Sequence, residues 1–458
     1  MANHNEQIFI SEYICFLGND DGENYLMFDD IVQICSFLIC VSLLLVNIIR
    51  KRKFYNPNII LYAIWTIILL FNLLNLYELN KVKGETYFYI LVGLFSYFIG
   101  SLVQDIFGTY RWRINFGKTS SYKIVINYSL IYFCAVLVFL LNLIDFIISV
   151  KYLNSGYSFN QIRAWKFETF DGSTNPITSR RSFVEQAIRV VFVAPFETAL
   201  LPISLIDFFQ NNKKKLLFFY IILLMLNMIS GGGARLGILT FLLMFVITSF
   251  IYNNKIIILK TKVKKLSKKL LIPGSIAIAL VIFFTIRRSK YSIIEELYYY
   301  LALDVSLFDY WLPQLKEGMH TYGTLFMFGI IRIPYMIIEK IGVSNLELYN
   351  LAKQYVLQAN KFKNVGGRVA NSFVTPFYYL YADAGIFGIV GGMFIFGFFS
   401  EKYFKRVVKT RKIQDIFILL LIIRGVIYTF IRWDFISTNY AMAYLTVFIF
   451  FKRVKTKK

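Results

Sequence analysis

Residues 31–53 read "IVQICSFLICVSLLLVNIIRKRK" and decide the class of fold. The segment 31–49 carries no charged residue and is long enough for a helix to cross a bilayer. The basic run at 50–53 then stops it, and basic residues collect on the cytoplasmic side of membrane proteins. The 30 residues before the segment hold no Lys or Arg, so they lack the basic start of a removable signal peptide. The stretch therefore predicts an uncleaved membrane anchor with its N-terminal flank outside.

The same apolar pattern recurs along the whole chain. Of the 458 residues, 57% are hydrophobic and 17% are charged, whereas roughly a quarter of the residues are charged in soluble domains. We expect a single integral membrane domain, 1–458, folded as an all-α polytopic helical bundle of about eleven transmembrane helices. The predicted spans are 31–49, 58–76, 87–106, 124–148, 183–209, 216–230, 235–252, 270–286, 384–401, 413–431 and 438–451.

The formal charge of +23 is explained by membrane topology and does not require a nucleic-acid partner. One set of linkers holds more than half of the 50 Lys and Arg residues in well under a fifth of the chain. This asymmetry predicts that this set is cytoplasmic, with the N-terminus outside and the C-terminus inside. The linkers of the basic set are 50–58, 107–123, 210–215, 253–269, 402–412 and 452–458.

Two predicted outer segments are long enough to carry a site. The first outer loop, 151–182, is polar, aromatic and basic, and the large outer loop, 287–372, is longer than any cytoplasmic linker. The large loop contains "IIEELYYYLALDVSLFDYWL" and "TLFMFGIIRIPYMIIEKI", which charges and Pro interrupt. These stretches predict amphipathic helices that lie on, or dip into, the outer face of the membrane.

A glycine hairpin, 229–244, separates two of the predicted spans and reads "ISGGGARLGILTFLLM". Glycines expose backbone N–H groups that can face an anion. Arg235 beside them offers a planar fork that suits a diphosphate. The alternative is a tight turn between helices whose arginine extends to the membrane surface.

Three further arginines lie in the predicted outer loops. Arg163 belongs to "GYSFNQIRAW" in the first outer loop, and a solvated basic loop is the alternative interpretation. Arg287 and Arg288 follow an outward-running span, where basic residues oppose the usual charge bias. All three are candidates for binding a diphosphate.

Ionisable residues inside predicted spans need a partner or a wet cavity. Arg189 and Glu197 lie two turns apart in the fifth span, so they could form a structural ion pair or serve a site. Arg424 in the tenth span has no acidic neighbour in the sequence. Its expected partner is an anion or a distant carboxylate such as Asp383.

The candidate general bases are His320, in "EGMHTYG", and Asp383, in "YADAGIFG". An unperturbed histidine suits proton transfer near neutral pH, although a lone loop histidine is more often simply exposed. Arg368, Asn371 and Tyr379 lead into the same glycine-rich span and are candidate glycan contacts, with the interfacial aromatic belt as the alternative for the tyrosine. The two histidines lie far apart and no clustered carboxylate motif occurs, so we expect no metal and no other cofactor.

Four of these stretches together carry a family resemblance: "GYSFNQIRAW", "SGGGARLGILTFLL", "HTYGTLFMFGIIRIPYMI" and "NSFVTPFYYLYADAGIFGIVGGMFIFG". The chain resembles the Wzy-type oligosaccharide repeat-unit polymerases of O-antigen and capsule synthesis over most of its length. Arg163, Arg235 and Asp383 fall at recognisable motif positions. The triple glycine is a variant of the usual hairpin, and "RIPYM" lacks the basic residue that often follows the proline.

The resemblance implies a glycosyltransferase at the outer face of the bacterial cytoplasmic membrane. It would transfer a growing glycan from undecaprenyl diphosphate to the next lipid-linked repeat unit, without a metal or a nucleotide sugar. Expected partners are the undecaprenyl-diphosphate-linked oligosaccharide, membrane lipids, a chain-length regulator and a flippase. Diphosphate binding is assigned to Arg163, Arg235, Arg287, Arg288 and Arg424, and the base to His320 or Asp383.

Three other functions fit parts of the pattern. An O-antigen ligase shares the architecture and chemistry but uses another acceptor. A lipid-linked oligosaccharide flippase would show two similar halves and smaller outer loops, and no internal repeat is evident. A non-catalytic membrane scaffold gives no reason for Arg424 at membrane depth.

Overall fold

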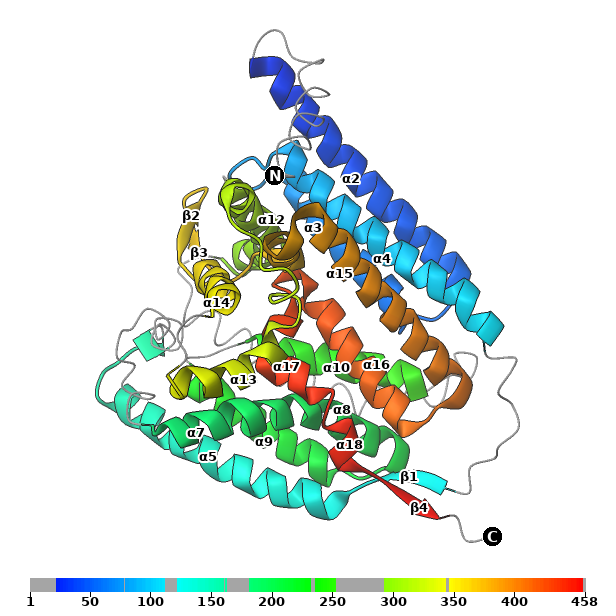
Figure 1. The fold of residues 1–458 in the computed structure, drawn as a ribbon, viewed down its shortest axis with the longest axis vertical. Helices are drawn as coiled ribbons and strands as arrows, with labels where there is room; N and C mark the ends of the chain where they lie inside the picture. Colours follow the sequence, from blue (N-terminus) through cyan, green and yellow to red (C-terminus); the bar gives the residue numbers. More distant parts are fainter. Residues whose placement is uncertain are drawn as a thin grey trace.

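The structure is a computed structural model that describes most of the chain as helices, with a few short strands (Figure 1). The predicted span at 270–286 lies outside the described residues. The residues described are 22–77, 79–111, 122–159, 161–162, 181–231, 235–252, 292–342 and 346–455.

Seven helical segments of the described chain are long and apolar enough to cross a membrane. This supports the prediction of a helical membrane bundle. Three shorter apolar segments, Lys215–Ser230, Leu236–Tyr252 and Thr438–Phe450, lie at other predicted spans, and the count of about eleven stays a prediction. The seven are Phe28–Lys51, Pro57–Leu74, Gly84–Gly108, Tyr128–Asn154, Phe183–Asn211, Thr375–Thr410 and Ile413–Phe430.

One part of the bundle joins the start of the chain to a late helix. It consists of α2 (Gly22–Lys51), α3 (Pro57–Leu74), α4 (Gly84–Arg111) and α15 (Thr375–Thr410), and Figure 1 shows α2, α4 and α15 side by side. Glycines bring α4 and α15 into backbone contact, as small residues do between membrane helices. A Cβ atom on Gly100 would lie 2.1 Å from the Phe394 carbonyl oxygen, and one on Gly397 would lie 2.1 Å from the Tyr97 carbonyl oxygen.

The long helix α15 is kinked where the sequence predicts a span to begin. Ala384 and Gly385 leave the helical region, and Gly385 has a φ of 60° that favours glycine. Two helical turns therefore precede the predicted start at 384, and they carry Tyr379 and Asp383. The kink separates the apolar part of α15 from a short buried segment, 375–383, that is rich in aromatic residues.

The second part of the bundle packs around α16 (Ile413–Ile427), which is buried along nearly its whole length. In Figure 1, α16 runs between the α4–α15 edge and a lower group of helices. The lower group is α5 (Tyr128–Asn154), α7 (Phe183–Ile188), the π-helix η1 (Arg189–Val193), α8 (Ala194–Asn211), α9 (Lys215–Ser230) and α10 (Leu236–Tyr252).

The expected ion pair between Arg189 and Glu197 is not the one that forms. Arg189 Nη1 lies 2.7 Å from Asp145 Oδ2, and its Nε lies 2.9 Å from Glu185 Oε1. Glu197 instead accepts a hydrogen bond from Asn142 on α5. The π-helical turn at Arg189 adds a residue to the helix and shifts the helical phase after it, so a pairing based on ideal helical spacing fails here.

The predicted large outer loop contains helices and a hairpin rather than irregular chain. The helix α12 lies against α3, α4 and α15, and β2 pairs with β3 in antiparallel register. Near the C-terminus, β4 pairs with β1, which lies before α5. The elements are α12 (Ile293–Glu317), α13 (Phe328–Lys340), α14 (Glu347–Ala359), β2 (Lys363–Val365), β3 (Arg368–Ala370), the 3-10 helices η2 (Tyr428–Phe430) and η3 (Asp434–Ile436), α17 (Thr438–Ala443), α18 (Val447–Phe450), β1 (Tyr122–Ile126) and β4 (Phe451–Lys455).

Candidate functional site

Glu296 on the first turn of α12 lies between two arginines that come from distant parts of the chain. Its Oε1 lies 2.5 Å from Nη2 of Arg368 on β3, and its Oε2 lies 3.6 Å from Nη2 of Arg235. The Glu296 side chain is only 9% exposed. A buried carboxylate is costly unless cations pair with it, so this contact fixes the hairpin and the start of α10 onto α12.

Two tyrosines on the same face of α12 complete this half of the site. Glu296, Tyr299 and Tyr300 have the spacing that places side chains on one side of a helix. Arg235 donates a hydrogen bond of 3.0 Å to the Tyr300 hydroxyl. The Arg368 guanidinium lies 4.2 Å from the centre of the Tyr299 ring, within range of a cation–π interaction. The helix therefore offers one carboxylate and two aromatic faces to two guanidinium groups.

A second carboxylate holds two more arginines at the end of α16. Asp434 on η3 lies 3.7 Å from Arg424 Nη2 and 3.4 Å from Arg432 Nη2. Both guanidinium groups also lie near the ring of Tyr428, at 4.9 Å for Arg424 and 5.9 Å for Arg432. The carboxylate that pairs with Arg424 is thus Asp434, and Asp383, which the sequence suggested as a distant partner, bonds elsewhere.

Direct side-chain contacts connect the two halves. The Tyr300 ring packs on Phe373 at 5.6 Å, and Phe373 in turn packs on Phe430 at 6.5 Å, between Tyr428 and Arg432 in the sequence. On α10, Thr240 shares a hydrogen bond of 3.3 Å with the Tyr428 hydroxyl. We call Arg235, Arg368, Arg424 and Arg432, with Glu296 and Asp434, the arginine cluster.

Among the described residues, the four guanidinium groups of the arginine cluster pair with two carboxylates. Within the described chain, Arg424 Nη1 and Arg432 Nε are buried and have no hydrogen-bond partner. Buried donors without acceptors are costly in a folded protein. An anion with several acceptor oxygens, such as a phosphate group, would satisfy them.

His320 and Asp383 form a separate site beyond the other end of α12. The Asp383 Oδ1 atom accepts hydrogen bonds from the Thr321 hydroxyl at 2.5 Å, from the Gly323 amide at 2.9 Å and from the Leu325 amide at 3.1 Å. His320 precedes this turn and faces Gly385 at the kink of α15, with its Nε2 3.5 Å from the Cβ position. Asp383 thus organises the loop that carries His320.

Within the arginine cluster, Glu296 and its two arginines lie far from His320. Glu296 lies at the start of α12 and His320 follows its end. A helical rise of 1.5 Å per residue separates them by roughly 30 Å. A base has to lie within hydrogen-bond reach of the proton that it removes. His320 therefore does not reach the Glu296 half of the arginine cluster. Asp383 lies closer to the Asp434 half, because it accepts from the Leu325 amide, and the next residue, Phe326, accepts from Trp433, which stands between Arg432 and Asp434 in the sequence.

Of the other predicted site residues that the structure describes, one belongs to the arginine cluster and two lie elsewhere. Arg368 belongs to the arginine cluster, whereas Asn371 donates a hydrogen bond of 2.9 Å to the Asn360 carbonyl and ties β3 to α14. Tyr379 is buried against Tyr378 and does not present a free ring to a glycan. Arg163, Arg287 and Arg288 lie outside the described residues, as do the hairpin residues 232–234.

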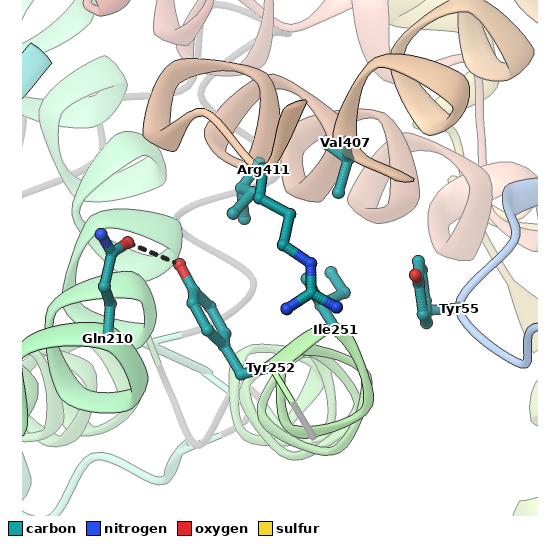
Figure 2. Close-up of a pocket in the computed structure, with 7 residues that line it drawn as sticks. Tyr55, Gln210, Ile251, Tyr252, Val407 and Arg411 are labelled. Atoms are coloured by element: carbon teal, nitrogen blue, oxygen red, sulfur yellow. Dashed lines mark hydrogen bonds between the residues drawn. The ribbon is translucent and has the colours of Figure 1, made fainter. Parts of the chain in front are cut away.

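A pocket of about 230 Å³ lies at the other, basic end of the bundle and is drawn in Figure 2. The Arg411 side chain extends into it between Tyr252 and Tyr55, and Tyr252 donates a hydrogen bond of 3.0 Å to Gln210. Arg411 belongs to the basic linker 402–412, so the predicted topology places this pocket on the cytoplasmic face. It contains none of the predicted site residues.

Sequence reasoning missed both carboxylates of the arginine cluster, together with Arg432 and the two tyrosines of α12. Comparison with known proteins does not identify these residues either. No family model matches the chain, and neither the curated proteins nor the solved structures give a significant match. In the described part of the chain, no group of three His, Cys, Asp or Glu residues could hold a metal ion.

Proposed function

We propose that this chain is a membrane glycosyltransferase that joins lipid-linked oligosaccharide repeat units at the outer face of a bacterial cytoplasmic membrane. The observation that supports the proposal is the arginine cluster, in which four largely covered guanidinium groups gather inside a helical membrane-type fold and buried donors of Arg424 and Arg432 have no described acceptor. The family resemblance of the sequence supports the same function. Arginine forks in a poorly hydrated setting suit the diphosphate of a polyprenyl carrier better than a single lysine does.

The reaction joins two lipid-linked substrates. A hydroxyl oxygen of the incoming repeat unit attacks the anomeric carbon of the growing glycan. The bond between that carbon and the diphosphate oxygen breaks, and undecaprenyl diphosphate leaves with the electron pair. The acceptor proton passes to a base. Because negative charge develops on the diphosphate, fixed guanidinium groups stabilise the transition state, by about 3 kcal/mol for one well-placed donor.

The position of Glu296 suggests how binding and proton transfer are coupled. In the structure, Glu296 pairs with Arg235 and Arg368. A diphosphate would compete for the same guanidinium groups and would release the carboxylate from them. The released Glu296 would then be one of the two carboxylates of the arginine cluster beside the bound substrate, and it would accept the proton of the acceptor hydroxyl. The loop at His320 would contact the glycan farther from the bond that forms.

The direct test uses purified protein in liposomes with undecaprenyl-diphosphate-linked repeat units, a metal chelator and no nucleotide. We expect a ladder of lengthening glycans together with release of undecaprenyl diphosphate. A protein that only moves the substrate between leaflets would accumulate no ladder. A protein that transfers polymer only when a lipid A core is added would be a ligase. Either of the last two results would overturn the proposal.

A further inference from the structure

A polar pocket of about 320 Å³ opens beside the first half of α12, between the N-terminal half of α2, the end of α3 and the connection from α3 to α4. Its volume lies at the lower end of the roughly 300–1,000 Å³ typical of small-molecule sites. Amide side chains line it from three segments: Gln33 on α2, Asn72 on α3, and Asn75 and Asn80 on the connection. Amides can donate and accept hydrogen bonds, as the hydroxyl groups of a sugar also do.

The inner wall of the pocket carries a hydroxyl that has no partner within the described chain. Ser306 on α12 lines the pocket and is 3% exposed, and its Oγ atom makes no hydrogen bond to a described residue. A buried hydroxyl without a partner is unfavourable unless a ligand or water satisfies it. The rings of Tyr87 and Tyr298 stand beside it and give the pocket aromatic surface.

The connection that forms the rim is held in an unusual backbone conformation. Asn75 and Tyr77 have φ values of 39° and 59°, in the left-handed region that costs a non-glycine residue roughly 1–2 kcal/mol. Two tyrosines of α12 hold this shape. The Leu76 amide donates to the Tyr298 hydroxyl at 2.7 Å, and the Tyr299 hydroxyl donates to the Tyr77 carbonyl at 2.9 Å.

The same two tyrosines connect the pocket to the arginine cluster. Tyr298 lines the pocket, and the neighbouring Tyr299 lies beneath the Arg368 guanidinium. A ligand with its diphosphate at the cluster would therefore extend its first sugars toward the amides. The only charged groups among the lining residues, Asp30 and Lys81, pair with each other at 3.0 Å. The pocket therefore suits a neutral, hydroxyl-rich ligand.

We propose that this pocket is a sugar subsite that binds a neutral residue of the lipid-linked glycan next to its diphosphate. The proposal rests on the proposed function, because that function supplies the glycan. It assigns a role to α2, α3 and the connection from α3 to α4, none of which contains a predicted site residue. Ser306 and the amides would donate to and accept from the sugar hydroxyls, and Tyr298 would pack on the ring.

The test compares Ser306→Ala, Ser306→Leu and the matched control Gln210→Leu, which alters the pocket at the opposite end of the bundle. The probe is the oligosaccharide that mild acid releases from the lipid-linked intermediates of the host cell. Its affinity for the purified protein is measured by calorimetry. We expect Ser306→Ala to weaken binding about fivefold to tenfold, the value of one hydrogen bond. Ser306→Leu should abolish binding, and the control should bind normally.

Thermal unfolding separates binding from folding. Ser306→Ala removes a hydroxyl that no described residue satisfies, so its midpoint should equal or exceed that of the wild type. Unchanged affinity in both Ser306 variants would overturn the subsite. Inorganic pyrophosphate serves as a second probe for the arginine cluster. If the oligosaccharide binds at the pocket while the liposome assay shows no polymer, the proposed polymerase fails and the subsite stands.

Discussion

At the scale of single residues, the shared carboxylates determine how the arginines are presented. Arg235 and Arg368 come from elements far apart in the sequence, and Glu296 pairs with both. Asp434 does the same for Arg424 and Arg432. A carboxylate in this position keeps buried cations stable in the absence of substrate and has to give way when an anion binds.

Glu296→Gln should therefore separate binding from turnover. Without the competing negative charge, inorganic pyrophosphate should bind more tightly than to the wild type. Turnover should fall because an amide cannot take the acceptor proton. The ligand-free variant should unfold at a lower temperature and regain stability when pyrophosphate is added. Calorimetric titration and thermal unfolding measure both effects, and weaker pyrophosphate binding would contradict the exchange of partners.

For Asp383, we predict a role in positioning the loop at His320 rather than in proton transfer. All three hydrogen bonds of its side chain to the 321–325 turn reach Oδ1, an acceptor that asparagine retains. We expect Asp383→Asn to keep most polymer synthesis and Asp383→Ala to lose both synthesis and thermal stability. If Asp383→Asn abolished synthesis in a fully folded protein, Asp383 would be the base rather than the residue that positions the loop.

At the scale of elements, the sequence predicts the apolar helices well because each is encoded locally. Hydropathy locates the apolar spans Phe28–Lys51 and Ile413–Phe430 within a few residues, and it also indicates helices in 287–372. It misses the strand β1, because β1 pairs with β4 more than 300 residues later and no local pattern encodes that partner. It also misses the two helical turns before the kink of α15, where polar and aromatic residues interrupt the apolar run.

The same limit explains which site residues the sequence could supply. Arg235 and Arg424 stand out because a charge is rare in apolar surroundings. Glu296 follows a second acidic residue in "IIEELYYY", and only the helical phase that places it with Tyr299 and Tyr300 distinguishes it from Glu295. No local signal joins Arg368 to Glu296, because they lie on a hairpin and a helix that meet only in the folded chain.

The contact between α4 and α15 predicts opposite effects for two glycines on one helix. Gly397→Ala would place its Cβ 2.1 Å from a backbone oxygen of α4, so the helices have to separate. Gly391 has no described heavy atom within 4 Å of its Cβ position. Thermal unfolding should show a loss of more than about 1–3 kcal/mol for Gly397→Ala. Gly391→Ala should gain roughly 0.5–1 kcal/mol, and equal effects would argue against the close packing.

At the scale of the whole molecule, the charge bias and the two pockets together predict an orientation. Arg411, in the pocket of Figure 2, belongs to a basic linker that is predicted to be cytoplasmic. The residues of the arginine cluster and of the polar pocket lie in predicted outer segments or in the predicted spans that adjoin them. A polymerase with lipid-linked substrates at the outer leaflet requires this arrangement. In the reverse orientation, the arginine cluster would face the cytoplasm, where the positive-inside rule already predicts an excess of Lys and Arg.

Cysteine labelling tests the orientation directly. In a cysteine-free variant, a membrane-impermeant maleimide should label Glu347→Cys on intact cells. Lys412→Cys should react only after the membrane is opened. Both positions are exposed in the structure, so access to the reagent depends on the side of the membrane. Labelling of Lys412→Cys alone on intact cells would invert the topology and remove the site from the outer face.

The most direct measurement of the central claim is the rate of glycan polymerisation in liposomes when Arg235 is replaced. We predict that Arg235→Ala lowers the rate by a factor on the order of 10²–10³, as expected when one charge-stabilising donor is lost. Arg235→Lys should retain part of the rate, and the matched control Arg453→Ala, on exposed β4, should retain all of it. A normal ladder from folded Arg235→Ala protein would show that the arginine cluster does not hold the diphosphate.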